Sequence, residues 1–422
     1  MYTEQEAIQY VRENDVRFIK LFFTDFYGSI KSISIQPSEL ERAFSKGITF
    51  DASSVKGFLW YAESDLFIVP DPSTLAVLPW RPQSGRVVRF FCSVRYPDGT
   101  PFEVDTRKML SELVEKARSK GFDFNVGTEC EFYLFKCDEK GNPTKEPYDM
   151  AGYCDLAPRD KGENVRREIC LTLEQMGVHP ETSYHEEGPG QNEVDFKYSD
   201  VLNAADNLQT FKIVVKAIAA RNGLFASFMP KPLSDKPGNG LHINISLYKD
   251  GKNLFAGDNF SDEAKSFLAG ILFRTLEIAP FTNPIPNSYM RLGTFEAPKY
   301  ISWSRQNRSQ LIRIPSGDEE AARMEFRASD PAGNPYIDLY LLLSAGLEGI
   351  EKHYELPEAT DIDFFNADPE ETRFMIRLPM SLGEAKKYCE KGDFIYKVFP
   401  KMLLDFLGKN ENETAEIDRG EI

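Results

Sequence analysis

FDFNVGTECEFYLF, residues 122–135, alternates apolar and polar side chains through most of its length. Side chains in a β-strand point alternately to opposite faces, so this pattern predicts a strand with one buried face. The opposite face carries Glu129 and Glu131, which a strand would place roughly 6.5–7 Å apart. Two carboxylates at that separation repel each other unless a proton, a base or a metal ion compensates their charge.

The same alternation recurs in three later segments, QNEVDFK at 191–197, LHINISLY at 241–248 and RMEFR at 323–327. Each combines an apolar face with a polar face, as in antiparallel sheets that bury one side only. A solvated face usually carries Lys, Thr, Ser and Gln, whereas these faces carry acids, a histidine and arginines. One interpretation is four unrelated solvated faces. The set as a whole favours a single sheet face that bears catalytic groups.

The chain of 422 residues has an ordinary globular composition, with 41% hydrophobic and 27% charged residues. Its length predicts two domains. A formal net charge of −16 argues against nucleic acids and anionic membranes as partners. It allows an anionic small substrate, because arginines or metal ions can reverse the local field. With no membrane-length apolar stretch, no secretory signal and no CxxC pair among six cysteines, we expect a cytoplasmic protein with reduced thiols.

Helix and strand signals divide the chain near residue 105. Before it, the sequence predicts a capped helix after Thr3, a loop at 50–56, and strands at 16–25, 28–35, 66–69 and 86–95. Asp105 is expected to cap a helix over 106–120. Further helices are expected at 164–176, 200–222, 262–278 and 335–352, between the polar-faced strands. We expect a small, mostly β domain at 1–104 and a large α+β domain at 105–422.

The polar faces carry side chains that suit divalent metal ions. Carboxylate oxygens with a single imidazole fit Mg²⁺ or Mn²⁺ better than a structural zinc site. Two neighbouring ions could be held by residues on the candidate strands or at their ends: Glu129, Glu131, Glu186, Glu193, Glu325 and His242. Alternation does not choose between Glu186 and its neighbour Glu187.

Arginines in one region of the sequence add groups that bind phosphate. Their forks bind carboxylates and phosphates bidentately, and the candidates are Arg291, Arg308, Arg313, Arg323 and Arg327. Ion pairing with neighbouring acids is the alternative, above all for Arg323. Metals with arginines suit phosphoryl transfer, which depends on positioning and charge neutralisation. No P-loop or Rossmann glycine motif occurs. The residues therefore favour a two-metal, phosphate-handling enzyme over a dinuclear hydrolase or nuclease.

The same segments resemble the type I glutamine synthetases of bacteria and archaea. The resemblance runs in the family's order through nearly the whole chain, including FDASSVKGF, GTECEFYLF, HEEGPGQNEVDF, GLHINISL, NRSQLIRIP and RMEFRASDPAGNPY. It implies an N-terminal β-grasp domain (1–104), and a catalytic domain (105–422) whose curved antiparallel sheet is flanked by helices. It also implies ATP-dependent ligation of ammonia to the γ-carboxylate of L-glutamate through γ-glutamyl phosphate, giving L-glutamine, ADP and phosphate.

Residue by residue, the resemblance implies two metal sites and sites for three substrates. Glu131, Glu186 and Glu193 would hold one metal beside glutamate and ammonium, and Glu129, His242 and Glu325 the other under the ATP phosphates. The seven-residue step to Glu193 favours Glu186 over Glu187. Glutamate and the transferred phosphoryl group would contact Gly238, Arg291, Glu296, Arg308 and Arg327. ATP would contact Glu181, Tyr198, Asn244, Ser246, Arg308 and Arg313. Asp51 from a neighbouring subunit would bind ammonium, and Glu296 on a mobile flap would help to deprotonate it.

Three departures from the family pattern lie around the glutamate and amine pockets. PGNG at 237–240 replaces NGSG, RLGTFEAP at 291–298 is one residue shorter than RLVPGYEAP, and Ala52 replaces a glycine beside Asp51. A γ-glutamyl-amine ligase that uses a polyamine or ethanolamine is therefore the alternative, although Asp51 and Glu296 favour ammonia.

Subtype and assembly are also expectations from the resemblance. The short connection at 136–153 is typical of the α subtype, whereas Trp60 stands where that subtype often has an arginine. The family forms hexameric rings with active sites shared between neighbours. The sequence after 409 lacks the strap that joins two rings, so we expect a hexamer or a weakly paired dodecamer.

Overall fold

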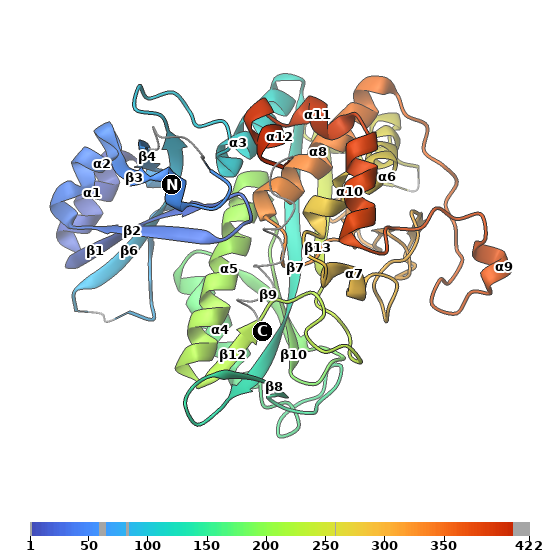
Figure 1. Ribbon diagram of the computed structural model, residues 1–422, viewed down its shortest axis with the longest axis horizontal. Helices are drawn as coiled ribbons and strands as arrows, with labels where there is room; N and C mark the ends of the chain where they lie inside the picture. The colour runs from blue at the N-terminus through green and yellow to red at the C-terminus, as the bar shows by residue number, and fades with distance from the viewer. Residues whose placement is uncertain (1, 59–64, 82–83, 258, 408–422) are drawn as a thin grey trace.

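The computed structural model describes residues 2–58, 65–81, 84–257 and 259–407 (Figure 1), and Trp60 lies outside them. The N-terminal part is a sheet of strand order β2-β1-β6-β4-β3, with β5 beside β6. Helices α1 (Glu4–Glu13) and α2 (Leu40–Lys46) pack against β1 and β4. The strands are β1 (Val16–Thr24), β2 (Ile30–Ile35), β3 (Ile48–Asp51), β4 (Asp65–Pro70), β5 (Ala76–Val77) and β6 (Arg86–Arg95).

The predicted loop at 50–56 is wrong in its first residues. Phe50 and Asp51 belong to β3, where they pair with Leu66 and Asp65 of β4. A 3-10 helix at Ala52–Ser54 follows, and Asp51 caps it by accepting a hydrogen bond from the backbone of Ser53. Backbone pairing with a strand that begins fourteen residues later (Asp65 against Asp51) has no local sequence signal, which explains the difference.

A larger sheet is built around β7 (Phe122–Cys137), which pairs antiparallel with β10 (Gln191–Phe196) and β13 (Leu241–Lys249). The sheet continues to β9 (Pro180–His185) at one edge and through β17 (Met324–Phe326), β16 (Ile312–Ile314) and β15 (Trp303–Arg305) at the other. Short strands β8 (Pro143–Pro147), β11 (Ser199–Asp200), β12 (Leu224–Ser227) and β14 (Lys252–Asn253) complete it. The alternation predicted for β7 is confirmed, because Phe124, Val126, Cys130 and Phe132 are buried in the core.

Long helices cover the apolar face of this sheet. The rings of Phe132 and Phe211 lie 5.9 Å apart, and those of Phe124 and Phe267 lie 5.8 Å apart. These contacts fix α5 (Val201–Arg221) and α6 (Asp262–Thr282) against β7. Helix α8 (Pro335–Lys352) packs along α6 (Figure 1), where a Cβ at Gly270 would lie 2.2 Å from the carbonyl oxygen of Ala345. The predicted α+β class with flanking helices is confirmed.

The remaining helices are α3 (Thr106–Ser119), α4 (Glu163–Gln175), α7 (Ser288–Arg291), α9 (Pro369–Thr372), α10 (Leu382–Lys391), α11 (Phe394–Val398) and α12 (Lys401–Leu407). The caps predicted at Thr3 and Asp105 are both present. Helix α6 runs four residues past the predicted end at 278 and through Pro280. Proline removes one hydrogen bond there, while the buried Phe281 and Thr282 hold the last turn in the core. Within the described ranges, no helix is long and apolar enough to cross a membrane.

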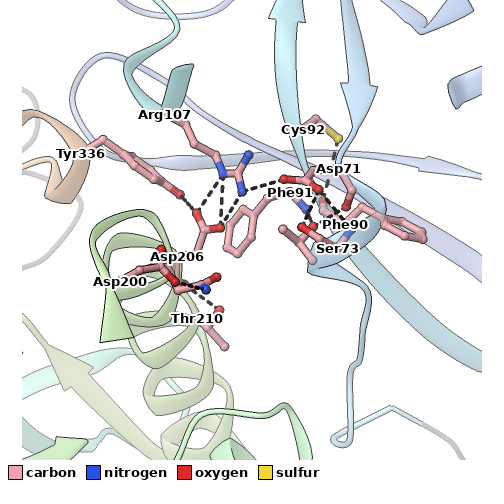
Figure 2. A network of polar contacts seen from close by, with 12 residues as sticks. Asp71, Ser73, Phe90, Phe91, Cys92, Arg107, Asp200, Asp206, Thr210 and Tyr336 are labelled. Carbon is pink, nitrogen blue, oxygen red and sulfur yellow. Dashed lines mark hydrogen bonds and ion pairs between the residues drawn. The ribbon is translucent and has the colours of Figure 1, made fainter. Parts of the chain in front are cut away.

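A buried polar network joins the N-terminal sheet to the helices of the larger domain (Figure 2). Arg107 at the start of α3 donates to both carboxylate oxygens of Asp206 on α5, with Nε–Oδ1 of 3.0 Å and Nη2–Oδ2 of 2.8 Å. It also donates to Asp71 Oδ2 at 3.0 Å, and Tyr336 of α8 donates to Asp206 Oδ1 at 2.7 Å. Because this geometry is bidentate and buried, it favours one orientation of the two parts.

Candidate active site

A cavity of about 500 Å³ opens on the polar face of β7, β10 and β13. Antiparallel register brings distant side chains together there, since His242 lies opposite Glu129 and Glu193 lies opposite Glu131. Charged residues dominate the lining: Glu129, Glu131, Glu186, Glu187, Glu193, Asp195, His242, Arg291, Glu296, Arg308, Arg313 and Arg327. The structure thus gathers most of the predicted acids and arginines, together with His242, around one cavity, whereas Glu325 and Arg323 are not among its lining residues.

Glu129, His242 and Glu325 form a compact group, with one ligand atom of each within 4.8 Å of the others. The Nδ1 of His242 lies 3.3 Å from Glu129 Oε2 and 3.6 Å from Glu325 Oε1. Burial, together with the charge of Arg327, lowers the pKa of His242, so the imidazole is neutral at pH 7. Burial opposes ionisation of Glu129, but hydrogen bonds from His242 and Asn244 lower its pKa to about 2. Two carboxylates and a neutral imidazole are a suitable donor set for Mg²⁺ or Mn²⁺.

Glu131, Glu186 and Glu193 surround the same cavity in a less compact group. Glu131 Oε2 accepts hydrogen bonds from the backbone N–H of Gly240 at 2.8 Å and from Gln191 Nε2 at 3.0 Å. Glu193 is buried, and its Oε1 has no hydrogen-bond partner among the described residues. Burial and the charge of Glu186 raise the pKa of Glu131 to about 8. Because a divalent cation would compensate the charge of the buried Glu193 and the half-buried Glu131 and Glu186, the trio fits a second metal ion.

Two arginines of the cavity are already paired with an acid. Arg327 Nη1 lies 2.6 Å from Glu325 Oε1, and Arg313 Nε lies 2.5 Å from Glu325 Oε2. Arg291 is buried, and it donates to the backbone carbonyls of Ala328 at 2.9 Å and Arg327 at 3.1 Å. Arg313 and Arg327 fix Glu325, and all three arginines line the cavity with positive charge that an anionic substrate can use.

Arg308 and Arg323 differ from that pattern. Arg308 is exposed at the cavity and makes no hydrogen bond or ion pair with any residue that the structure describes. Arg323 donates to Asn244 Oδ1 at 2.9 Å and to the carbonyl of Ala321 at 3.0 Å. The alternative of ion pairing therefore holds for Arg313 and Arg327, whereas Arg323 forms no ion pair with an acid among the residues that the structure describes.

The predicted ATP contacts lie along the sheet beside Glu129. Asn244 of β13 donates to Glu129 Oε1 at 2.8 Å, and Ser246 donates to the carbonyl of Ala322 at 2.9 Å. Tyr198 lies next to Gly127 of β7 and is 63% exposed. Glu181 is exposed on β9. The structure brings Asn244 and Tyr198 to the Glu129 part of β7, and the nucleotide roles of all four residues stay predictions.

Asp51 differs from the other predicted site residues because it lies in the N-terminal sheet and not in the larger domain that holds the cavity. It ends β3 of the N-terminal sheet, and it is absent from the cavity lining within the described part of the chain. Its Oδ1 accepts from Ser53 N at 2.9 Å and Ser53 Oγ at 2.6 Å, and its Oδ2 accepts from Ser54 Oγ at 3.0 Å. One subunit therefore does not bring Asp51 to its own cavity.

A second compact group of acids and histidine, Asp149, Asp160 and His185, adjoins Glu186. Arg166 donates to both carboxylate oxygens of Asp160, and His185 Nε2 lies 2.8 Å from Asp149 Oδ1. His185 Nδ1 lies 2.6 Å from the carbonyl oxygen of Glu186. Both ring nitrogens face acceptors, which favours the protonated imidazole; burial disfavours it, but the hydrogen bond to Asp149 outweighs burial and raises the pKa of His185. These cations already neutralise the acids, so the group supports the backbone at Glu186 rather than a metal.

The loop PGNG at 237–240 closes the cavity beside Glu131. Tyr133 Oη donates to the carbonyl of Pro237 at 2.7 Å, and Gln191 Nε2 donates to that of Gly238 at 3.1 Å. A Cβ at Gly238 would lie 2.3 Å from the carbonyl oxygen of Pro230, so only glycine fits there. Sequence reasoning missed Gln191, although it shares the polar face with Glu193 and the alternation could have found it. Asp149 and His185 lie in separate segments and gave no comparable signal.

Two family models match the chain. One, described as the glutamine synthetase beta-Grasp domain, covers residues 15–97, and the other, the glutamine synthetase catalytic domain, covers residues 103–420. The glutamine synthetase of Clostridium saccharobutylicum is 46% identical over 403 residues, which are 94% of this chain and 91% of the relative. That of Methanosarcina mazei is 48% identical over 400 residues, covering 93% of this chain and 90% of the relative.

Solved structures show the same fold. A GmaS/ADP complex superposes with a TM-score of 0.88 at 30% identity and covers 98% of this chain and 96% of that one. A cryo-EM structure of Plasmodium falciparum glutamine synthetase gives a TM-score of 0.86 at 24% identity, covering 100% of this chain and 97% of that one.

Proposed function

Because the chain belongs to the glutamine synthetase family, we propose that the charged cavity on β7, β10 and β13 is where it joins ammonia to the γ-carboxylate of L-glutamate. The enzyme is a ligase that uses ATP and divalent metal ions to form L-glutamine, ADP and phosphate. The observation that supports the site most strongly is the strand register, which sets His242 opposite Glu129 and Glu193 opposite Glu131.

Two ions, Mg²⁺ or Mn²⁺, would be held on either side of the phosphoryl-transfer path. Glu131, Glu186 and Glu193 would hold the one beside glutamate and ammonium, and Glu129, His242 and Glu325 the one under the ATP phosphates. The buried Oε1 of Glu193, which has no hydrogen-bond partner in the described ranges, and the neutral imidazole of His242 support these ligand sets. Bound there, the ions neutralise charge that develops as the phosphoryl group moves between two anions.

The substrates would occupy the cavity and the adjoining part of the sheet. Glutamate would be bound by residues that surround Glu131 and the cavity mouth: Gly238, Arg291, Glu296, Arg308 and Arg327. ATP would be bound by residues on the Glu129 side: Glu181, Tyr198, Asn244, Ser246, Arg308 and Arg313. Arg291, buried and fixed by two backbone carbonyls, offers a rigid positive group for the substrate carboxylate.

The reaction would proceed in two steps. A γ-carboxylate oxygen of glutamate attacks the γ-phosphorus of ATP, ADP leaves, and γ-glutamyl phosphate forms, with Arg308 and Arg327 stabilising the transferred group. Asp51 binds ammonium and takes one proton from it. Ammonia then attacks the acyl carbon, phosphate leaves with its bonding electrons, and Glu296 takes the second proton.

Since Asp51 lies away from the cavity of its own subunit, we propose a homo-oligomer whose active sites lie between subunits. A hexameric ring, or a weakly paired dodecamer, supplies the neighbouring copy, and light scattering that shows a tight dodecamer at low concentration would contradict this. We also propose the division into domains 1–104 and 105–422, the α-like subtype and a cytoplasmic location.

One assay tests the function directly. Phosphate release with ATP, Mg²⁺ and glutamate is compared for ammonium, ethanolamine, putrescine and spermidine. We expect ammonium to be strongly preferred, because the relatives at 44–48% identity are glutamine synthetases and not γ-glutamyl-amine ligases. A clear preference for an organic amine would overturn the assignment.

A further inference from the structure

Residues 293–297 (GTFEA), here called the flap segment, form an exposed turn at the edge of the cavity. Its backbone hydrogen bonds are local, from Thr294 N to Arg291 O at 3.1 Å, Ala297 N to Thr294 O at 3.1 Å and Gly293 N to Pro298 O at 3.0 Å. Among the described residues, no strand pairs with residues 293–297. Its position over the cavity therefore depends on side-chain contacts with other segments.

Lys231 makes those contacts from a buried position. Its Nζ donates to the carbonyl of Lys236 at 2.5 Å and to Thr294 Oγ1 at 3.3 Å, and it lies 4.3 Å from the centroid of the Phe295 ring. The three ammonium protons thus have three acceptors, one of them an aromatic face. In the described part of the chain, the bond from Lys231 Nζ to Thr294 Oγ1 is the only hydrogen bond that joins the flap segment to a different region.

The backbone of Lys231 is itself held firmly. Prolines stand on both sides of it, at 230 and 232. Its N–H donates to Asn287 Oδ1 at 2.7 Å, and Asn287 Nδ2 donates back to its carbonyl at 3.0 Å. A buried ammonium on a fixed backbone can position a mobile partner, because little freedom remains on its own side of the contact.

The flap segment carries Glu296 toward the Glu186 part of the cavity. Glu296 lines the same cavity as Glu186 and Glu187. Phe295, the residue before Glu296, has a φ of +50°, a left-handed conformation that is uncommon for a bulky residue. The contact between the Phe295 ring and Lys231 helps to hold Phe295 in this backbone conformation.

We propose that Lys231 is a positioning residue that anchors the flap segment over the amine end of the cavity, keeping Glu296 in place and water away from the reacting carbon. This inference rests on the proposed function. Without the anchor, water competes with ammonia for γ-glutamyl phosphate. Its oxygen bonds to the acyl carbon, phosphate leaves, and glutamate re-forms with release of a proton, so ATP is hydrolysed without product.

The test measures phosphate and glutamine together for Lys231→Met, Lys231→Arg and the wild type. For Lys231→Met we expect the KM for ammonium and the phosphate-to-glutamine ratio at low ammonium each to rise by about tenfold, the order of a lost desolvated cation–π contact and hydrogen bond. The KM for ATP stays within about twofold. Lys231→Arg keeps a cation over Phe295 and restores part of the coupling. Lys216→Met removes another lysine–phenylalanine contact, 5.8 Å from the Phe228 ring, and should leave coupling unchanged.

A folded Lys231→Met enzyme with the wild-type ratio and KM for ammonium would overturn the inference. If Lys231→Met does not fold, Phe295→Leu on the exposed segment decides: a raised ratio supports the anchor, and an unchanged ratio overturns it. A wild-type enzyme that makes no glutamine would instead overturn the proposed function, so the two failures are distinguishable.

Discussion

Replacing Glu131 by glutamine removes one charge from a proposed metal site and keeps the shape of the side chain. Both hydrogen bonds to this carboxylate, from Gly240 N at 2.8 Å and Gln191 Nε2 at 3.0 Å, end on Oε2. The amide oxygen of the new side chain can take that position. Its NH₂ group then occupies the position of Oε1, which accepts no hydrogen bond from the described residues, and an NH₂ group does not bind a metal ion.

The size of the effect follows from the lost charge. One unit charge about 4 Å from another contributes about 4 kcal/mol at an effective dielectric constant of about 20. Since about 1.4 kcal/mol corresponds to a factor of ten, Glu131→Gln should weaken metal binding about a thousandfold and reduce kcat/KM at fixed Mg²⁺ at least as much. Because both hydrogen bonds persist, the metal-free free energy of unfolding should fall by less than about 1 kcal/mol.

The assay combines glutamine formation over a Mg²⁺ titration with thermal unfolding in chelator. Asp123→Asn is the matched control, because Asp123 lies on the same strand but is 55% exposed and pairs with Arg118 on the surface. We expect the control to behave as the wild type in both measurements. Glu131→Gln activity within tenfold of wild type at the same Mg²⁺ midpoint would refute the ligand assignment, and loss of the fold would refute the hydrogen-bond argument.

Three further predictions concern other parts of the molecule. Glu186→Gln should lower activity about a hundredfold or more, whereas Glu187→Gln should cost less than tenfold; equal losses measured in the glutamine assay would show that the seven-residue spacing chose wrongly. Asp206→Asn leaves the largely buried Arg107 guanidinium, 11% exposed, without its bidentate partner and should lower the free energy of unfolding by about 3 kcal/mol in a denaturant titration. Burial raises the pKa of Asp338 well above its usual value, and neither of its carboxylate oxygens has a hydrogen-bond partner in the described ranges. The native state then binds the proton of Asp338 more tightly than the unfolded state does, so the stability that this proton contributes is lost as pH rises through the folded pKa. Asp338→Asn should flatten this fall and stabilise the protein at pH 7 by about 1 kcal/mol. An unchanged dependence of the free energy of unfolding on pH would contradict the prediction.

The sequence predicted the elements whose side chains follow a simple period. In β7 the alternation placed Cys130 in the core and Glu129 and Glu131 on the opposite face, and burial raises the pKa of the Cys130 thiol to about 12, as expected for an inert cysteine. The capping residues Thr3 and Asp105 are local signals and were predicted for the same reason. Period and caps are properties of a few neighbouring residues, which a single sequence contains in full.

Contacts between distant segments could not be predicted in this way. His185 contacts Asp149 across 36 positions, and Lys231 reaches Thr294 across 63, with no periodic pattern to link them. The network around Arg107 likewise depends on how the N-terminal sheet docks on α5 and α8. The ammonium role of Asp51 was likewise predicted only from the family resemblance. In one subunit Asp51 lies in the N-terminal sheet and not in the cavity lining, so no pattern of neighbouring residues could connect it with the site.

An oxygen-18 transfer measurement tests the central claim most directly. L-Glutamate labelled with oxygen-18 in its γ-carboxylate is incubated with ATP, Mg²⁺, ammonium and the wild-type enzyme, and the released phosphate and glutamine are analysed by mass spectrometry. If the cavity forms γ-glutamyl phosphate and ammonia then displaces the phosphate, each phosphate carries one labelled oxygen and equals the glutamine in amount. Unlabelled phosphate, or phosphate release without glutamine, would contradict the account.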